Sequence, residues 1–102
     1  MIVNYNVYTA DYIWYGGNWC KFHDDKFTGK SLDIEDTGYH DDYSDRLIIK
    51  ALKQNGFLCW RYKYKVSRKF DSVEDNDFIE IQCEDDMPVL HLKDSKNDSV
   101  NA

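Results

Sequence analysis

The residue types best suited to chemistry occur in two copies of one tripeptide, His23-Asp24-Asp25 and His40-Asp41-Asp42. Imidazole binds zinc, iron or nickel and carboxylate binds magnesium or manganese, so two runs that met in space would supply a metal-dependent hydrolase. However, neither run has an established ligand spacing, and Asp pairs are also common in turns and at helix N-termini. We therefore expect no metal or other cofactor, and keep four candidate metal ligands: His23, Asp25, His40 and Asp42.

A cysteine nucleophile is the second chemistry to consider, because Cys20 lies three residues before His23. A reactive thiolate needs an accessible, positive setting. Lys21 supplies a charge, but Trp19 and Phe22 favour burial, and no third orienting residue can be assigned. The chain has three widely spaced cysteines and no C-x-x-C pair: Cys20, Cys59 and Cys83. This pattern predicts reduced, buried thiols in a cytosolic protein. We also expect that the chain is not an enzyme.

Acidic side chains dominate the charge of the chain, which is −6 over 102 residues. The stretch 71–86 contains no Lys, Arg or His and carries eight candidate partner-binding acids: Asp71, Glu74, Asp75, Asp77, Glu80, Glu84, Asp85 and Asp86. A second group surrounds the expected start of a helix: Asp33, Glu35, Asp36, Asp41, Asp42 and Asp45. Carboxylates gathered on one face would resemble a phosphate backbone and attract a basic protein. The alternative is a solvated acidic surface that aids solubility.

Aromatic residues are too many for one small core, since 16% of the chain is Phe, Trp or Tyr. Tyr and Trp are common interface anchors. Several lie around Gly16-Gly17, and four of these are candidate contacts for a partner or for a second copy of the chain: Tyr12, Trp14, Tyr15 and Trp19.

The run Arg61-Tyr62-Lys63-Tyr64-Lys65 interleaves cations with rings, as single-strand nucleic-acid platforms do. In a strand, however, alternate side chains point to opposite faces, so the rings and the charges separate. We expect the cations to pair across strands with Glu80 or Glu84. Together with the net charge, this argues against direct nucleic-acid binding.

Local patterns predict a single α+β domain, a mainly antiparallel sheet with one amphipathic helix packed on it. The helix is expected over 43–55, capped by Asp42 or Ser44 and ended by Gly56. Turn signals predict a hairpin around Gly16-Gly17 and a turn at 28–30. Alternation predicts strands near 2–9, 12–15, 19–22, 31–35, 58–66, 78–83 and 89–92. We assign the domain to 1–93 and a polar C-terminal tail to 94–102.

These observations favour a non-enzymatic, acidic interaction protein. The chain has no signal peptide and no apolar run of about 18 residues, so we expect a cytoplasmic protein without membrane contact. The chain is rich in Lys, Asn, Ile and Tyr, which AT-rich codons encode. Such codons are typical of low-GC bacteria and their phages, so we expect a phage or mobile-element accessory protein. By analogy with anti-CRISPR and DNA-mimic proteins, it would inhibit a host nucleic-acid-binding complex through a basic protein partner. The alternatives are an accessory or structural subunit that forms an oligomer through an aromatic face, and the metal-dependent hydrolase.

Overall fold

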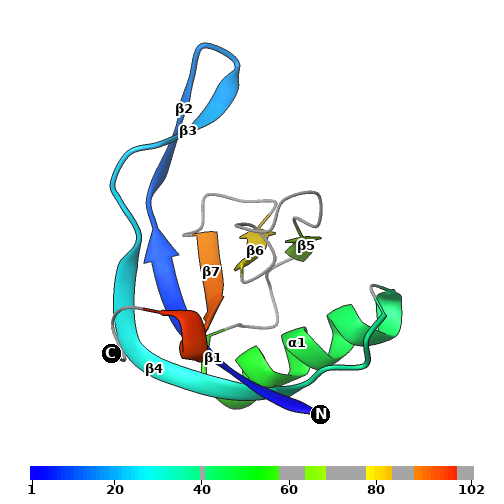
Figure 1. Cartoon of the computed structure of the whole chain (residues 1–102). Helices are drawn as coiled ribbons and strands as arrows, with labels where there is room; N and C mark the ends of the chain where they lie inside the picture. Colours follow the sequence, from blue (N-terminus) through cyan, green and yellow to red (C-terminus); the bar gives the residue numbers. More distant parts are fainter. Residues whose placement is uncertain (40, 58–63, 69–77, 84–88, 99–102) are drawn as a thin grey trace.

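The computed structural model describes residues 1–39, 41–57, 64–68, 78–83 and 89–98. In chain order its elements are β1 (Ile2–Ala10), β2 (Tyr12–Tyr15), β3 (Asn18–Lys21), β4 (Lys26–Glu35), α1 (Asp42–Gln54), β5 (Tyr64–Arg68), β6 (Phe78–Cys83), β7 (Val89–Asp94) and the 3-10 turn η1 (Ser95–Asn97). One helix packs on an antiparallel sheet (Figure 1), so the predicted α+β class is confirmed. Within the described residues, no helix is long and apolar enough to cross a membrane.

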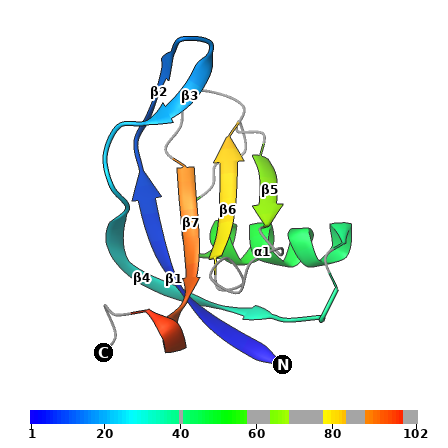
Figure 2. The ribbon, with the colours of Figure 1, turned by 45° about the horizontal axis from the view of Figure 1, so that its top comes forward.

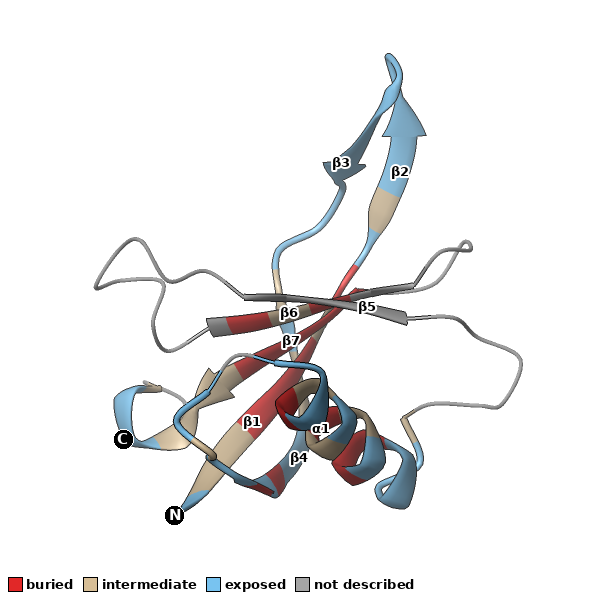
Figure 3. Cartoon of the chain, turned by 90° about the vertical axis from the view of Figure 1, so that its right-hand side faces the viewer, coloured by how far each residue is buried: buried red, intermediate tan, exposed pale blue. Residues whose placement is uncertain are grey.

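The main sheet has five strands in the order β4-β1-β7-β6-β5, and the hairpin β2–β3 extends from one end of it (Figure 2). Alternation along each strand gives the sheet two different faces. The face toward α1 carries the apolar core, to which the helix contributes Ile48, Ala51 and Leu52. The strands contribute Val7, Leu32, Ile34, Ile79, Ile81, Leu90 and Leu92. The buried residues line β1, β7 and the inner side of α1 (Figure 3).

Helix α1 lies where it was predicted, with both ends one residue earlier than 43–55, but its N-cap is Asp41 and not Asp42 or Ser44. The backbone is still extended at Asp41, whose carboxylate accepts a hydrogen bond from the N–H of Ser44 at 3.0 Å. Ser44 is therefore the third helical residue and supplies the donor, while Asp42 lies in the first turn. The helix starts one residue earlier than expected because Asp41 presents the acceptor.

The end of α1 is the predicted glycine stop. Gly56 has a φ of +80°, and its N–H bonds to the carbonyl of Lys53 at 3.1 Å. The N–H of Phe57 bonds to the carbonyl of Leu52 at 3.1 Å, which completes a Schellman motif. Phe57 also packs against the core cluster. The same residues thus end the helix and fix its last turn on the sheet.

The predicted turn at 28–30 is wrong, because β4 runs without a break from Lys26 to Glu35. The glycine signal instead marks a bulge: Asn6 pairs with Ser31 and Tyr8 with Phe27, so residues 28–30 lie opposite Val7 alone. Gly29 adopts a φ of +81°, which glycine reaches without steric cost. The Thr28 hydroxyl donates to the carbonyl of Val7 at 2.7 Å and closes the bulge. A turn residue can therefore bend a strand without ending it.

The strands of the second half agree in place with the prediction where the structure describes them. β6 has the predicted bounds, and Ile79 and Ile81 face the core. β7 continues two residues beyond the predicted 89–92. Of the strand predicted over 58–66, only the part from Tyr64 onward lies within the described residues, and β5 continues two residues beyond the predicted end, to Arg68. The prediction that Lys65 pairs with Glu80 or Glu84 across the strands is wrong, because Lys65 lies opposite Gln82.

Candidate functional site

The hairpin β2–β3 is the most distinctive surface feature of the described chain, because it projects beyond the end of the main sheet (Figure 1). Its two strands pair with each other as a separate sheet. Trp14 is 62% exposed, Tyr15 73% and Trp19 49%, and Ile13 and Phe22 are exposed as well. Five large apolar side chains in water within one short segment are typical of an interaction surface.

The hairpin register places Trp14 directly opposite Trp19. Their ring centroids are 5.3 Å apart and the rings meet edge to face, an arrangement that contributes about 0.5–1.5 kcal/mol beyond burial. The other face of the ribbon carries Ile13 opposite Cys20. An isolated two-stranded hairpin is at best marginally stable in water. The aromatic pair therefore holds the ribbon together while most of its apolar surface stays available for contact.

The base of the hairpin is narrow. The N–H of Phe22 donates to the carbonyl of Asp11 at 2.7 Å, and this bond links the two sides of the ribbon just before the main sheet begins. Strand β4 then starts at Lys26, which pairs with Thr9. Residues 22–25 on one side therefore face only two residues, 10 and 11, on the other. This mismatch lets the hairpin leave the sheet at an angle.

A cluster of ionisable groups lies beside this base, on the sheet face that points away from α1. The Asp25 carboxylate lies 2.6 Å from Nζ of Lys21, 3.1 Å from Nδ1 of His91 and 3.3 Å from Nζ of Lys93. We call these four residues the Asp25 cluster. Burial by itself would raise the pKa of Asp25, but the Lys21 hydrogen bond and the neighbouring positive groups outweigh it and lower that pKa. The carboxylate is therefore ionised at neutral pH.

A second polar group extends the same face toward the C-terminal end. Nδ2 of Asn6 donates to the Asp98 carboxylate at 2.9 Å, and the Tyr8 hydroxyl donates to the same oxygen. Burial and the Asp98 carboxylate raise the pKa of Tyr8 to about 12, so the phenol keeps its proton. Nζ of Lys93 lies 4.5 Å from the centre of the Tyr8 ring. Residues 94–98, which we assigned to a polar tail, thus contain η1 and a carboxylate bonded to β1.

His91 gives the described structure its clearest expected pH dependence. It is 2% exposed, and burial lowers its pKa, against the opposing effect of the Asp25 and Glu80 carboxylates. Because the unfolded chain then takes up this proton more readily, stability should be full above pH 6.5 and fall as the pH drops below that value. For one proton the slope is at most about 1.4 kcal/mol per pH unit.

Urea denaturation between pH 7.5 and about pH 5 measures this slope, staying above the range in which carboxylates lose their charge. We expect His91→Gln to flatten it, with His23→Gln as the matched substitution at an exposed position. A slope that persists unchanged in His91→Gln would contradict the account, because another group would then carry the pH dependence.

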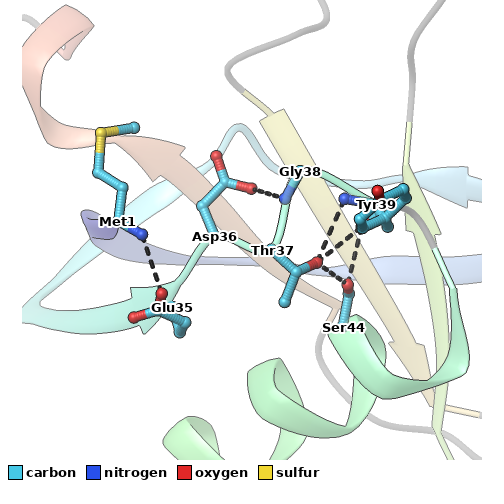
Figure 4. A network of polar contacts seen from close by, with 7 residues as sticks. All are labelled: Met1, Glu35, Asp36, Thr37, Gly38, Tyr39 and Ser44. Atoms are coloured by element: carbon cyan, nitrogen blue, oxygen red, sulfur yellow. Dashed lines mark hydrogen bonds and ion pairs between the residues drawn. The ribbon is translucent and has the colours of Figure 1, made fainter.

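The second predicted acidic group spans the end of β4, the connection that follows it and the first turn of α1. We call it the acidic connection: Asp33, Glu35, Asp36, Asp41, Asp42 and Asp45. Several of its carboxylates make local bonds (Figure 4). Glu35 pairs with the N-terminal ammonium at 2.9 Å and Asp36 accepts from the N–H of Gly38 at 2.9 Å. Asp33 accepts from Asn4 at 2.8 Å. The acidic connection lies near α1, at the end of the molecule away from the hairpin (Figure 1).

The structure separates the candidate metal ligands. Asp25 belongs to the Asp25 cluster, whereas Asp42 lies in the first turn of α1 on the other side of the sheet. His23 and Asp24 line a shallow cavity of about 250 Å³ together with Asp11 and Lys26. Within the described residues, no three His, Cys, Asp or Glu side chains form a group that could hold a metal. His40 lies outside those residues.

Most of the first acidic stretch also lies outside the described residues. Glu80 alone of its eight members is described, half-buried on β6 opposite Ser67 and His91. The aromatic candidates are all placed: Trp14, Tyr15 and Trp19 are exposed on the hairpin. Tyr12 is half-buried near the base, where burial raises its pKa.

The expected burial of Cys20 is wrong, since this thiol is exposed. The apolar neighbours Trp19 and Phe22 favoured burial of Cys20. Both are themselves exposed, because the hairpin does not pack on the sheet. Cys59 and the side chain of Cys83 lie outside the described residues.

Sequence reasoning also missed the polar cluster around Asp25. A usable signal was present, because His91 interrupts an apolar strand run, Val89-Leu90-His91-Leu92. A histidine at an alternate strand position faces the side away from the core. Its contact with Asp25 still depends on pairing between distant segments.

Comparison with known proteins adds no identification. No protein-family model, no curated protein and no solved structure matches the chain.

Proposed function

We propose that this chain is a non-enzymatic interaction protein that docks on a protein partner through the hairpin β2–β3. The observation that carries the proposal is the projecting pair Trp14 and Trp19, with Tyr15 on the other face of the ribbon, all exposed where the main sheet does not cover them. Large aromatic side chains lose little entropy on binding and fill apolar pockets, which makes them frequent anchors of interfaces. The expected contact is an apolar slot that receives the hairpin.

The net charge of −6 supports a partner with a basic surface around that slot. Our finer proposal is that this partner is a nucleic-acid-binding protein of the host, which the chain inhibits. The exposed carboxylates of the acidic connection support it, because they extend the negative field over a second end of the molecule. Since that end lies away from the hairpin, the aromatic contact and the acidic surface are separable in an experiment.

The test compares three forms of the full chain for binding to host proteins: wild type, Trp14→Ala/Trp19→Ala, and Asp33→Asn/Asp36→Asn. We expect a partner that is retained by wild type, lost by the aromatic variant and released from wild type by moderate salt. Reduced retention by the Asn variant supports a basic partner. Equal retention by wild type and the aromatic variant would overturn docking through the hairpin.

A second copy of the chain is the competing occupant of the hairpin. Residues 12–20 contain no charged side chain that would block edge-to-edge pairing, whereas the equal negative charge of two copies opposes it. Light scattering at tens of micromolar separates the two: we expect a monomer. A dimer that dissociates in Trp14→Ala/Trp19→Ala would replace the hetero-partner proposal with self-association.

A further inference from the structure

Within the part of the chain that the structure describes, few contacts join the hairpin to the main sheet. Backbone pairing stops where residues 22–25 face only residues 10 and 11, and the bond from Phe22 to Asp11 belongs to the hairpin base itself. Such an irregular step acts as a hinge unless side chains bridge it. Among the described residues, Asp25 has a side chain that bridges this step.

Asp25 connects the last residue of the hairpin to the centre of the sheet. One carboxylate oxygen lies 2.6 Å from Lys21, the last residue of β3, and 3.1 Å from His91 of β7. The other oxygen lies 3.3 Å from Lys93, also on β7. Both sides of the hinge are therefore tied to one carboxylate, which is 15% exposed. Partial burial makes the ion pairs of Asp25 with Lys21 and Lys93 stronger than fully exposed pairs.

We propose that Asp25 is a positioning residue that fixes the direction of the hairpin relative to the sheet. Its purpose rests on the proposed docking function: a preoriented ribbon presents Trp14 and Trp19 without paying an ordering entropy on binding. The positioning role itself is a property of the free protein and can be tested without a partner.

Removing the charge of Asp25 should loosen the hinge for two reasons. The amide of Asp25→Asn carries no charge and holds Lys21 more weakly, so the tie between the hairpin and the sheet weakens. In addition, the ammonium groups of Lys21 and Lys93 then repel each other across the hinge without the carboxylate between them. The titratable groups that surround this position come from five elements: Tyr8 of β1, Tyr12 of β2, Lys21 of β3, Glu80 of β6, and His91 and Lys93 of β7.

Nuclear magnetic resonance of the isolated full chain at neutral pH tests the proposal. In wild type we expect residual dipolar couplings of the hairpin amides to fit the same alignment as those of the main sheet. In Asp25→Asn we expect them to shrink, with hairpin order parameters falling from about 0.85 toward 0.6. Asp25→Glu, which keeps the charge, should restore part of the alignment. Asp24→Asn changes the neighbouring exposed carboxylate and serves as the matched control.

Hairpin couplings that are the same in Asp25→Asn as in wild type would overturn the positioning role. If Asp25→Asn does not fold, Lys21→Met removes only the hairpin side of the bridge, and unchanged couplings in that variant overturn the role equally. The measurement uses no partner. A rigid hairpin that fails to bind the partner would contradict the docking function and leave the positioning role intact. A mobile hairpin that still binds the partner would contradict the positioning role alone.

Discussion

Alanine at Trp14 or Trp19 is expected to weaken binding of the partner by about 30-fold or more, equivalent to about 2 kcal/mol for each interface anchor. Each indole carries a large apolar area on a projecting ribbon, and the two rings support each other at 5.3 Å. Removing either ring deletes contact area and weakens the ribbon that presents the other. Calorimetric titration of the retained partner with each variant measures the change.

Tyr43→Ala is the matched control for this prediction, because Tyr43 is 63% exposed but lies on α1. Its affinity for the partner should equal that of wild type. Both Trp variants should keep the unfolding free energy within about 1 kcal/mol of wild type, since the hairpin contributes nothing to the core cluster. A partner affinity that falls equally in Tyr43→Ala, or that stays unchanged in both Trp variants, contradicts docking through the hairpin.

Leu52→Ala is expected to lower the unfolding free energy by about 2–5 kcal/mol. Leu52 is 0% exposed and packs between α1 and the sheet, and its carbonyl accepts the bond from Phe57 that ends the helix. The substitution leaves a cavity in a small core, in which few other side chains can compensate for the lost contacts. Because a domain of this size is stable by only about 5–15 kcal/mol, the expected loss is a large fraction of its unfolding free energy. Urea denaturation measures the loss.

The adjacent substitution Lys53→Ala tests the same helix without touching the core, because Lys53 is exposed. Its effect should stay within about 0.5 kcal/mol. A loss below about 1 kcal/mol in Leu52→Ala would show that α1 does not pack on the sheet as described.

The elements that sequence predicts well are those whose signals are local. The α1 start, face and stop lie within one segment, and Gly16-Gly17 between aromatic runs is sufficient to place the hairpin. The exposure of Trp14 and Trp19 follows less directly. Their exposure arises because the hairpin extends past the main sheet. The sequence of the hairpin alone does not predict that extension.

Features that require distant segments to meet were not predictable. The bulge at Gly29 depends on the register between β1 and β4, without which a glycine between polar residues has the pattern of a turn. Asp25 is a candidate metal ligand in the sequence because His23 precedes it, yet its partners His91 and Lys93 lie near the other end of the chain. Strand pairing, and not the spacing of the tripeptide, decides what this carboxylate contacts.

Amide hydrogen exchange of the chain, free and bound to its partner, tests docking through the hairpin most directly. We expect exchange to slow at residues 12–22 on binding, because the ribbon is exposed when free and covered when bound. Residues of α1 should exchange at the same rate in both states. Protection confined to α1 or the acidic connection, with unchanged exchange at residues 12–22, would contradict the account.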